Sequence, residues 1–148
     1  MAHISTFVYC EGIQVEETNQ GNKTHIINPQ QIFTPAFIPS LYSFSISFGV
    51  IGVKYKENQV MVYKFINKNT NEVLIDSGDI NINSKKTDLP EELNGFMMNI
   101  DFKNIVFKNE GYYESEIYLN NEKIEDVNEF NEDSEKGSII YEVLRVIN

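Results

Sequence analysis

The sequence predicts an all-β protein: an antiparallel β-sandwich of about eight or nine strands with at most one short helical turn, with a β-barrel as the alternative architecture. Three observations lead to this fold class. Apolar and polar residues alternate at every second position in many stretches, which is the period of a half-buried strand. The apolar residues are mostly Ile, Val, Phe and Tyr, with only two Ala, and such side chains pack well on a pleated sheet. Polar turns separate the runs and no long amphipathic helix lies between them, which excludes parallel strand–helix–strand units.

The clearest strand is residues 41–53, where bulky apolar side chains alternate with Ser and Gly. We expect one buried face, and a small polar face that lies against solvent or close to another backbone. In residues 3–15, Phe7 and Tyr9 are expected on one face and Ile4 on the other. The predicted strands are residues 3–15, 24–28, 41–53, 59–67, 72–76 (which can continue through 79–83), 95–107, 112–119, 123–127 and 138–147.

Short polar segments predict how the strands connect. The segment Asn-Lys-Asn-Thr-Asn at residues 67–71 predicts a hairpin of its two flanking runs. Three prolines between residues 29 and 39 predict a loop or edge crossing, because proline cannot donate to a strand ladder. The apolar residues among these prolines, Phe33 and Phe37 included, are expected to pack over one end of the core. A single helical turn is expected within residues 84–94, which contain Pro90.

Length and charge limit the classes of function. A chain of 148 residues is one domain, and a domain of this size buries roughly 70% of its unfolded surface. The formal net charge of -10 repels nucleic-acid phosphates and anionic membrane surfaces, so neither is an expected partner. The charge suits a solubilising surface, or a protein partner with a basic groove.

Cysteine content and the N-terminal residues indicate the compartment. Cys10 is the one cysteine, so no intramolecular disulfide and no cysteine-based zinc site can form. The first residues lack the basic and long apolar regions of a signal peptide, and no segment approaches the length of a membrane span. A cytoplasmic location is therefore expected, and the oligomeric state stays open.

An acidic segment at residues 122–135 is the most charged part of the chain. Calcium needs about six to eight oxygen ligands, which loops of a sandwich can supply. The spacing does not match the helix–loop–helix calcium motif, so a solvated loop is the simpler interpretation and a calcium site the alternative. The candidate binding residues of this segment are Asp126, Glu129, Glu132, Asp133 and Glu135.

A row of rings and carboxylates marks the strand predicted at residues 112–119. Tyr112, Glu114, Glu116 and Tyr118 occupy alternate positions and so share one face of the strand. Such a face suits recognition of a basic protein partner. The alternative is an ordinary exposed face of a sheet.

No motif indicates catalysis. The histidines, His3 and His25, are expected at surface or edge positions, and Cys10 is expected to be a buried small hydrophobe. No phosphate-binding glycine loop and no nucleophile–histidine–acid pattern occurs. We therefore expect no enzyme activity, no metal and no cofactor.

Two stretches and the proline-rich crossing resemble a family of small bacterial proteins known only as a domain of unknown function. The stretches are residues 5–11 (Ser-Thr-Phe-Val-Tyr-Cys-Glu) and residues 111–122, which begin Gly-Tyr-Tyr and end Ile-Tyr-Leu-Asn-Asn-Glu. The resemblance implies a β-sandwich for most of the chain and supplies no catalytic residues.

The expected function is that of a non-enzymatic cytoplasmic binding protein that acts through an acidic sheet face or loops. A sharper form of this hypothesis is a phage-encoded inhibitor of a host defence nuclease, whose basic groove an acidic surface can occupy. The alternatives are a structural or assembly module of a phage or bacterial apparatus, and a sandwich that binds a small ligand or calcium.

Overall fold

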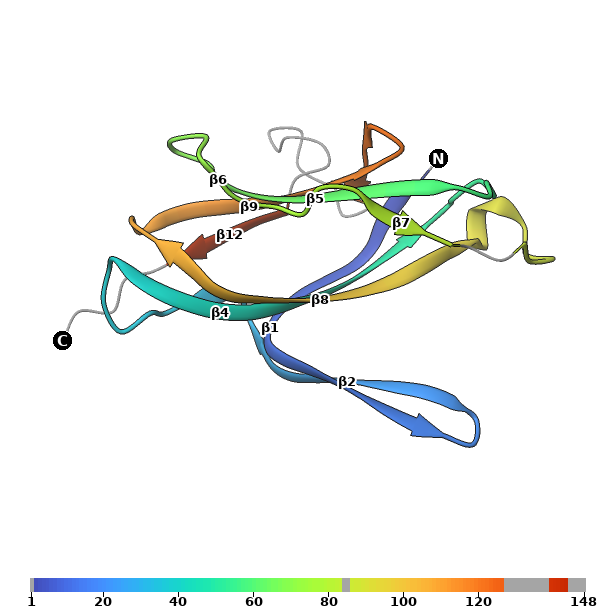
Figure 1. The fold of residues 1–148 in the computed structure, drawn as a ribbon, viewed down its shortest axis with the longest axis horizontal. Helices are drawn as coiled ribbons and strands as arrows, with labels where there is room; N and C mark the ends of the chain where they lie inside the picture. The colour runs from blue at the N-terminus through green and yellow to red at the C-terminus, as the bar shows by residue number, and fades with distance from the viewer. Residues whose placement is uncertain (1, 84–85, 127–138, 144–148) are drawn as a thin grey trace.

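Two β-sheets pack face to face in this protein (Figure 1). The computed structural model describes residues 2–83, 86–126 and 139–143. The antiparallel β-sandwich predicted from the sequence is confirmed. Within the described ranges the helical structure is one 3₁₀ turn, η1 (Glu91–Leu93), which lies inside the segment predicted to hold a single helical turn.

The first sheet is built on one long strand, β1 (His3–Thr18). β4 (Ser40–Ile51) pairs antiparallel with one edge of β1, and β8 (Gly95–Phe107) pairs antiparallel with β4. The other edge of β1 is shared: β11 (Glu125–Asp126) pairs parallel with its beginning, and β2 (Gly21–Gln30) pairs antiparallel with the rest.

The second sheet is centred on β9 (Gly111–Leu119) and β5 (Gln59–Asn67), which pair antiparallel. β5 pairs with β6 (Val73–Asp76), as the hairpin prediction requires. More strands are present in the described residues than the predicted eight or nine, because several are only two residues long. The remaining strands of this sheet are β3 (Ile32–Phe33), β7 (Ile80–Ile82), β10 (Glu122–Lys123) and β12 (Ile139–Val143).

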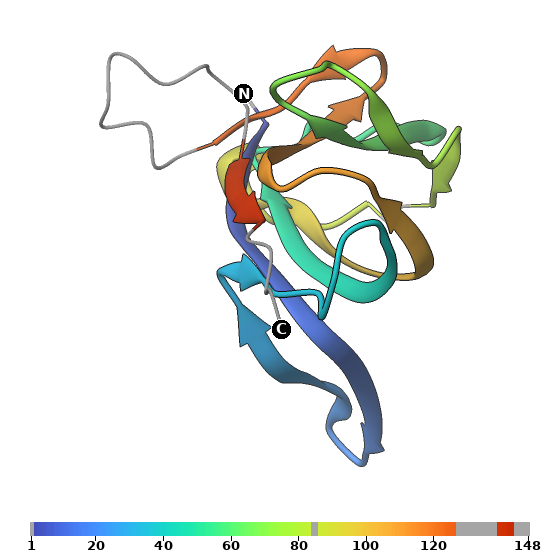
Figure 2. The same cartoon turned by 90° about the vertical axis from the view of Figure 1, so that its left-hand side faces the viewer.

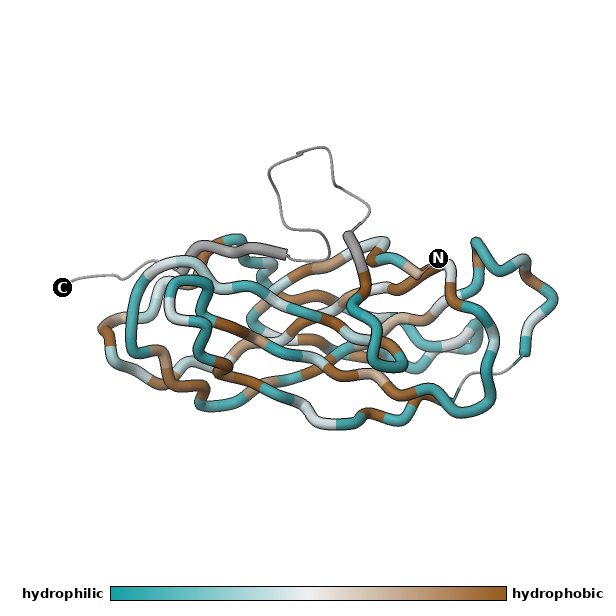
Figure 3. The backbone as a smooth tube through the Cα atoms, turned by 90° about the horizontal axis from the view of Figure 1, so that it is seen from above, coloured by the Kyte–Doolittle hydropathy of each residue, from teal (hydrophilic) through white to brown (hydrophobic). Residues whose placement is uncertain are grey.

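Aromatic rings from both sheets fill the space between the layers. The Phe44 ring of β4 lies 5.4 Å from the Phe65 ring of β5, centroid to centroid, and Phe65 stacks on Tyr113 of β9 at 5.5 Å. The alternation predicted for residues 41–53 produces this arrangement, because every second side chain of β4 enters the core. Figure 3 shows hydrophobic and hydrophilic residues following one another along the strands.

Three buried hydroxyl groups join the two sheets at the centre of this core. Tyr9 projects from β1, and Tyr63 and Ser115 project from β5 and β9; all three side chains are buried. The hydroxyls of Tyr9 and Tyr63 both hydrogen-bond to Ser115 Oγ, the Tyr63 contact measuring 2.7 Å. Burial raises the pKa of the Tyr63 hydroxyl, so this hydroxyl stays protonated and available as a donor.

A β-bulge overturns the predicted faces of β1. The register with β4 shifts between Ile4 and Thr6, so Ile4 enters the core on the same side as Tyr9 rather than the opposite side. One extra residue reverses the face of everything before it, and the alternation of residue types does not reveal where it lies.

The small polar face of β4 is covered by longer side chains of its neighbour β8. Ser47 Oγ donates to Asn99 Oδ1 at 2.7 Å, and the Met97 side chain lies over Gly49. The proline-rich crossing is only partly buried: Phe33 is in the core as expected, but Phe37 is 65% exposed. The expectation that Phe37 packs over the core is therefore wrong. Phe33 is held in the second sheet by the pairing of β3 with β12, whereas Phe37 lies in the loop between β3 and β4.

The far halves of β1 and β2 form a two-stranded arm that leaves the sandwich (Figures 1 and 2). β1 pairs with β4 only as far as Cys10, whereas its pairing with β2 continues from Gly12↔Ile27 to Thr18↔Gly21. The outer edge of β2 pairs with no other strand in the part of the chain that the structure describes.

Ser115→Ala is expected to lower the free energy of unfolding by about 1–3 kcal/mol, because two buried tyrosine hydroxyls then lose their shared partner. Urea titration followed by circular dichroism measures the change. Ser5→Ala, at an exposed serine, is the matched control and is expected to change the free energy by less than about 0.5 kcal/mol. Equal effects of the two substitutions would contradict the bridging role of Ser115.

Candidate functional site

The predicted row of Tyr112, Glu114, Glu116 and Tyr118 lies on the outer face of the second sheet. The intervening residues of β9 point into the core, where Tyr113, Ser115 and Ile117 are buried, so the row faces away from the sandwich. The structure thus brings these four residues together in the way the alternation predicted, and their role in binding stays a prediction.

Lysines on the two strands next to β9 contact Glu116 and Tyr118, which form one half of the row. In the register of β5 with β9, Lys64 lies opposite Glu116. In the register of β10 with β9, Lys123 lies opposite Tyr118. Lys123 Nζ forms an ion pair with Glu116 Oε2 at 2.8 Å, and Lys64 Nζ lies 5.3 Å from the centre of the Tyr118 ring.

In the same half of the row, Tyr118 and Glu116 are joined by a hydrogen bond. Tyr118 donates its hydroxyl proton to Glu116 Oε1 at 3.1 Å, so both oxygens of Glu116 have partners. Burial disfavours the Lys123 ammonium, but its hydrogen bond and charge attraction to Glu116 outweigh burial and raise the pKa of Lys123. Burial, followed by the negative charge of Glu116, raises the pKa of Tyr118.

Among the described residues, no lysine forms an ion pair with the other half of the row. Glu114 is only 8% exposed, and its Oε2 atom is buried with no hydrogen-bond partner in the described part of the chain. Tyr112, two residues away on the same face, is 49% exposed. Lys68 lies beside Tyr112, because its backbone N–H donates to the Tyr112 carbonyl at 2.9 Å, but none of the ion pairs among the described residues includes Lys68.

The row is therefore less acidic than its sequence indicates. Glu116 is neutralised by Lys123, and the Tyr118 ring is already occupied by Lys64. Lys64 belongs to β5, which is distant in sequence from β9, so no local pattern could predict its contact with the Tyr118 ring. Lys123 is close in sequence, because β10 follows β9 across the turn at Asn120 and Asn121. What remains is one nearly buried carboxylate, Glu114, which is attracted by the Lys123 charge but forms no ion pair among the described residues, beside one exposed ring, Tyr112.

The acidic segment predicted at residues 122–135 is described only at its beginning. Glu122 belongs to β10, and Asp126 belongs to β11, where its backbone pairs with Ile4 of β1. The other candidates lie outside the described residues: Glu129, Glu132, Asp133 and Glu135. In the described ranges, no three His, Cys, Asp or Glu side chains come together as a metal site would require.

The two histidines lie apart and the cysteine is buried. His3 begins β1, whereas His25 lies in the arm, where its Nε2 atom is 2.8 Å from Glu16 Oε2. Cys10 is buried as predicted, and burial raises the pKa of its thiol. A thiol that stays protonated is a poor nucleophile.

Comparison with known proteins gave no match to a protein-family model and no match among curated proteins. The family resemblance of residues 5–11 and 111–122 stays a prediction. No helix among the residues that the structure describes is long and apolar enough to cross a membrane.

Glu114→Leu is expected to stabilise the protein by about 1 kcal/mol or more, because it removes a buried carboxylate whose Oε2 atom has no hydrogen-bond partner among the described residues. Chemical denaturation of the wild-type and variant proteins measures this change. Glu57→Leu, at an exposed glutamate, is the control and is expected to have little effect. A clear loss of stability in Glu114→Leu would show that the carboxylate already has a stabilising partner.

Proposed function

We propose that this protein is a non-enzymatic binding protein that recognises a positively charged segment of a partner protein through the outer face of its second sheet. One observation carries the proposal: Glu114 is a nearly buried carboxylate whose Oε2 atom has no hydrogen-bond partner among the described residues, and it shares its face with the exposed ring of Tyr112. A lysine or arginine side chain of the partner supplies the missing cation.

The protein itself contains an example of the completed arrangement. Glu116 and Tyr118 are also a carboxylate and a ring two positions apart, and they hold Lys123 and Lys64. Glu114 and Tyr112 repeat the same two residue types on the same face without a cation. By this comparison, a cation from outside the chain makes an ion pair with Glu114 and a ring contact with Tyr112.

Energetic considerations support a charged occupant. A carboxylate taken out of water without a partner costs free energy in the unbound protein, and this cost is recovered when a cation docks. Removing one member of a buried charge pair at an interface weakens binding by about 2–5 kcal/mol. The formal net charge of -10 adds a long-range attraction that speeds encounter with a basic partner.

A partner with a basic groove fits this description, and inhibition of a nuclease is the narrow form of the proposal. Such a complex loses affinity steeply as salt rises, because steering by charge is screened. Three results support this narrow form. The immobilised protein retains a nuclease at low salt, releases it at high salt, and retains it more weakly when it carries Glu114→Gln. Retention that is independent of salt contradicts it.

Glu114→Gln is expected to weaken binding of a tetra-arginine amide peptide by about tenfold or more, which corresponds to about 1.4 kcal/mol. The amide keeps the shape of the side chain but is neutral, so it cannot form an ion pair with a guanidinium. NMR titration measures the dissociation constant and identifies the affected amides, which are expected on β9.

The matched control is Glu57→Gln, which removes the same charge at an exposed position far from the row. It separates a specific site from attraction to the whole acidic protein. Lys68→Met removes the ammonium of the residue whose backbone pairs with Tyr112 and is expected to leave the affinity unchanged or to raise it. If Glu114→Gln and Glu57→Gln weaken binding equally, the peptide has no specific site on this face.

The arm supports a second candidate function, that of an assembly module. Its strands place Ile13 opposite Ile26 and Val15 opposite Thr24, so one face of the arm is uncharged along these pairs. The opposite face carries the His25–Glu16 ion pair. A two-stranded hairpin is only marginally stable alone in water, so contact of this face with the same face of a second copy would support it.

Val15→Lys is expected to convert an assembled form of the protein to the monomer, because a charge then lies in the contact between arms. Size-exclusion chromatography with light scattering measures the mass in solution. Leu93→Lys is the control, because Leu93 is 56% exposed, close to the 55% of Val15, but lies on η1. A wild-type protein that stays monomeric at every concentration tested contradicts this second function.

A further inference from the structure

β8 forms an edge of the first sheet along its whole length. One side of β8 pairs with β4, and the other side pairs with none of the strands that the structure describes. β8 has 13 residues, whereas β2 has 10 and the short strands at the other sheet edges have at most 4. Backbone N–H and C=O groups on the free side of β8 are therefore available to a further strand.

The free side of β8 lacks the features that usually prevent a sheet edge from pairing. Proteins protect such edges with proline, lysine, bulges or short strands. Residues 95–102 contain no proline and no lysine, and their register with β4 is regular. The bulge of β8 comes only at residues 103–104, after the pair Phe44↔Phe102. The other long edge strand, β2, contains Pro29.

The core-facing side chains of β8 are covered on one side only. Four of them pack against the core but are only partly buried: Phe96, Met98, Ile100 and Phe102. Their partners on β4 are no more than 2% exposed: Val50, Phe48, Ile46 and Phe44. The difference arises because β4 lies between β1 and β8, whereas β8 has a neighbour on one side. An added strand with apolar residues at alternate positions would remove this remaining apolar surface from water.

The outward-facing side of β8 carries two polar side chains that β4 holds in place. Ser47 Oγ donates to Asn99 Oδ1 at 2.7 Å, and Ser45 Oγ donates to Asp101 Oδ1. Asp101 is exposed and takes part in none of the ion pairs found among the described residues. A strand that pairs with β8 places one of its side chains directly opposite this carboxylate, and opposite charges favour such a pair.

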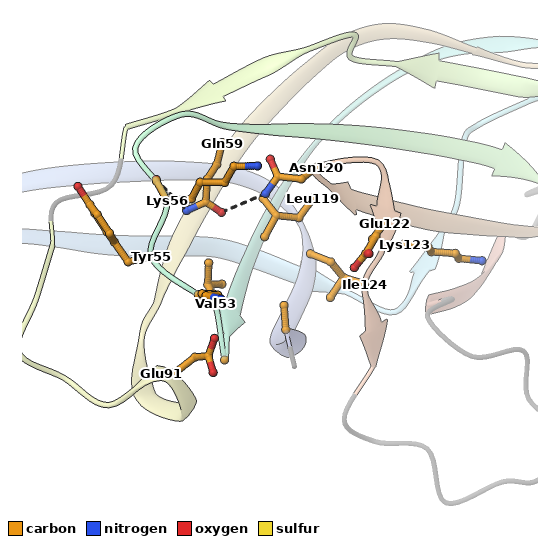
Figure 4. A pocket seen from close by; sticks show the side chains of 13 residues that line it. Val53, Tyr55, Lys56, Gln59, Glu91, Leu119, Asn120, Glu122, Lys123 and Ile124 are labelled. Carbon is orange, nitrogen blue, oxygen red and sulfur yellow. Dashed lines mark hydrogen bonds between the residues drawn. The ribbon is translucent and has the colours of Figure 1, made fainter.

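Hydrogen bonds fix the beginning of β8 next to a cleft at one end of the sandwich (Figure 4). The Val53 N–H donates to the Asn94 carbonyl at 2.9 Å, and Asn94 Nδ2 donates to the Val53 carbonyl at 2.7 Å. Val53 lines this cleft, which has a volume of about 630 Å³. The edge is therefore in place before a partner arrives, which lowers the entropic cost of binding.

We propose that the free edge of β8 binds an extended segment of a partner protein as an additional antiparallel strand along residues 96–102. The segment has apolar residues at alternate positions, on the same side as the partly buried side chains of β8, and a lysine or arginine opposite Asp101. Main-chain hydrogen bonds supply affinity, and the alternate side chains supply specificity. The inference rests on β8 alone and does not depend on partner binding by Glu114.

A basic partner segment fits this edge better than a second copy of β8 does. A second copy repeats the apolar alternation, but its residues 95–102 include no lysine, arginine or histidine that could face Asp101. Two copies also repel each other, because each has a formal net charge of -10. The same charge attracts a segment that carries a cation.

NMR titration with the end-blocked peptide Val-Lys-Val-Thr-Val-Thr-Val tests the proposal. When this peptide pairs antiparallel with residues 96–102, its valines face the core side and its lysine lies opposite Asp101. Binding is expected to protect alternate backbone amides of residues 96–102 from hydrogen exchange, because the added strand accepts their hydrogen bonds. The peptide Val-Val-Lys-Thr-Thr-Val-Val has the same composition without the alternation and is expected to give no such protection. Equal protection by both peptides, or no protection of β8 at millimolar peptide, would overturn the proposal.

Charge variants at residue 101 test the cross-strand pair. A peptide with glutamate in place of the lysine is expected to bind the wild-type protein about fivefold more weakly. Asp101→Asn can still accept the hydrogen bond from Ser45 and is expected to abolish this preference, and Asp101→Lys is expected to reverse it. Glu17→Gln is the control, because it removes the same charge near the exposed tip of the arm. If Asp101→Asn keeps the preference as Glu17→Gln does, the proposal is wrong.

Two further measurements separate this edge from other modes of binding. Glu114→Gln is expected to leave binding of the alternating peptide unchanged, and a clear loss of binding would place the peptide on the outer face of the second sheet and contradict the proposal. Hydrogen exchange of the protein alone is expected to be independent of its concentration at residues 96–102. Protection of these amides that grows with protein concentration would show that a second copy occupies the edge, which also contradicts the proposal.

Discussion

The arrangement of the two sheets depends on the hydroxyls of Tyr9 and Tyr63 sharing Ser115 in the dry space between them. A buried hydroxyl without a partner is costly, so these groups favour one relative placement of the sheets, whereas aromatic packing alone tolerates several. The same contact determines the register of β9. A slip of one residue would remove Ser115 from the core and bring Glu114 or Glu116 into it.

The outer-face row is a consequence of that register. With Ser115 and its alternate neighbours inside, the carboxylates of β9 must face outward, where lysines of β5 and β10 meet them. The protein has 12 basic and 22 acidic residues, so cations are scarce and some carboxylates are left without one. Glu114 is a nearly buried carboxylate that forms no ion pair among the described residues, and our proposal of a positively charged partner rests on it.

Alternation allowed the buried and outer faces of β4 and β9 to be predicted, because both strands lack bulges in their central parts and one face of each lies against the core. It failed at Ile4, where a bulge changes the phase, and the apolar character of Phe37 was misleading because this residue lies in a loop outside the sheets. It also predicted that Tyr112, Glu114, Glu116 and Tyr118 share a face. It could not predict that Lys64 contacts the Tyr118 ring, because β5 and β9 are distant along the chain. Lys123, in contrast, reaches Glu116 across the short β9–β10 hairpin.

The sequence by itself determined the all-β class, the hairpin of β5 with β6 and the face of each regular strand, because these follow from the local preference of side chains for water or for the interior. The tertiary structure alone decided which strands became neighbours, which charges were paired, that the arm leaves the sandwich and that a cleft forms at its end. These features depend on how distant segments meet. The free energies that bring such segments together are summed over the whole core, and no short stretch of sequence contains them.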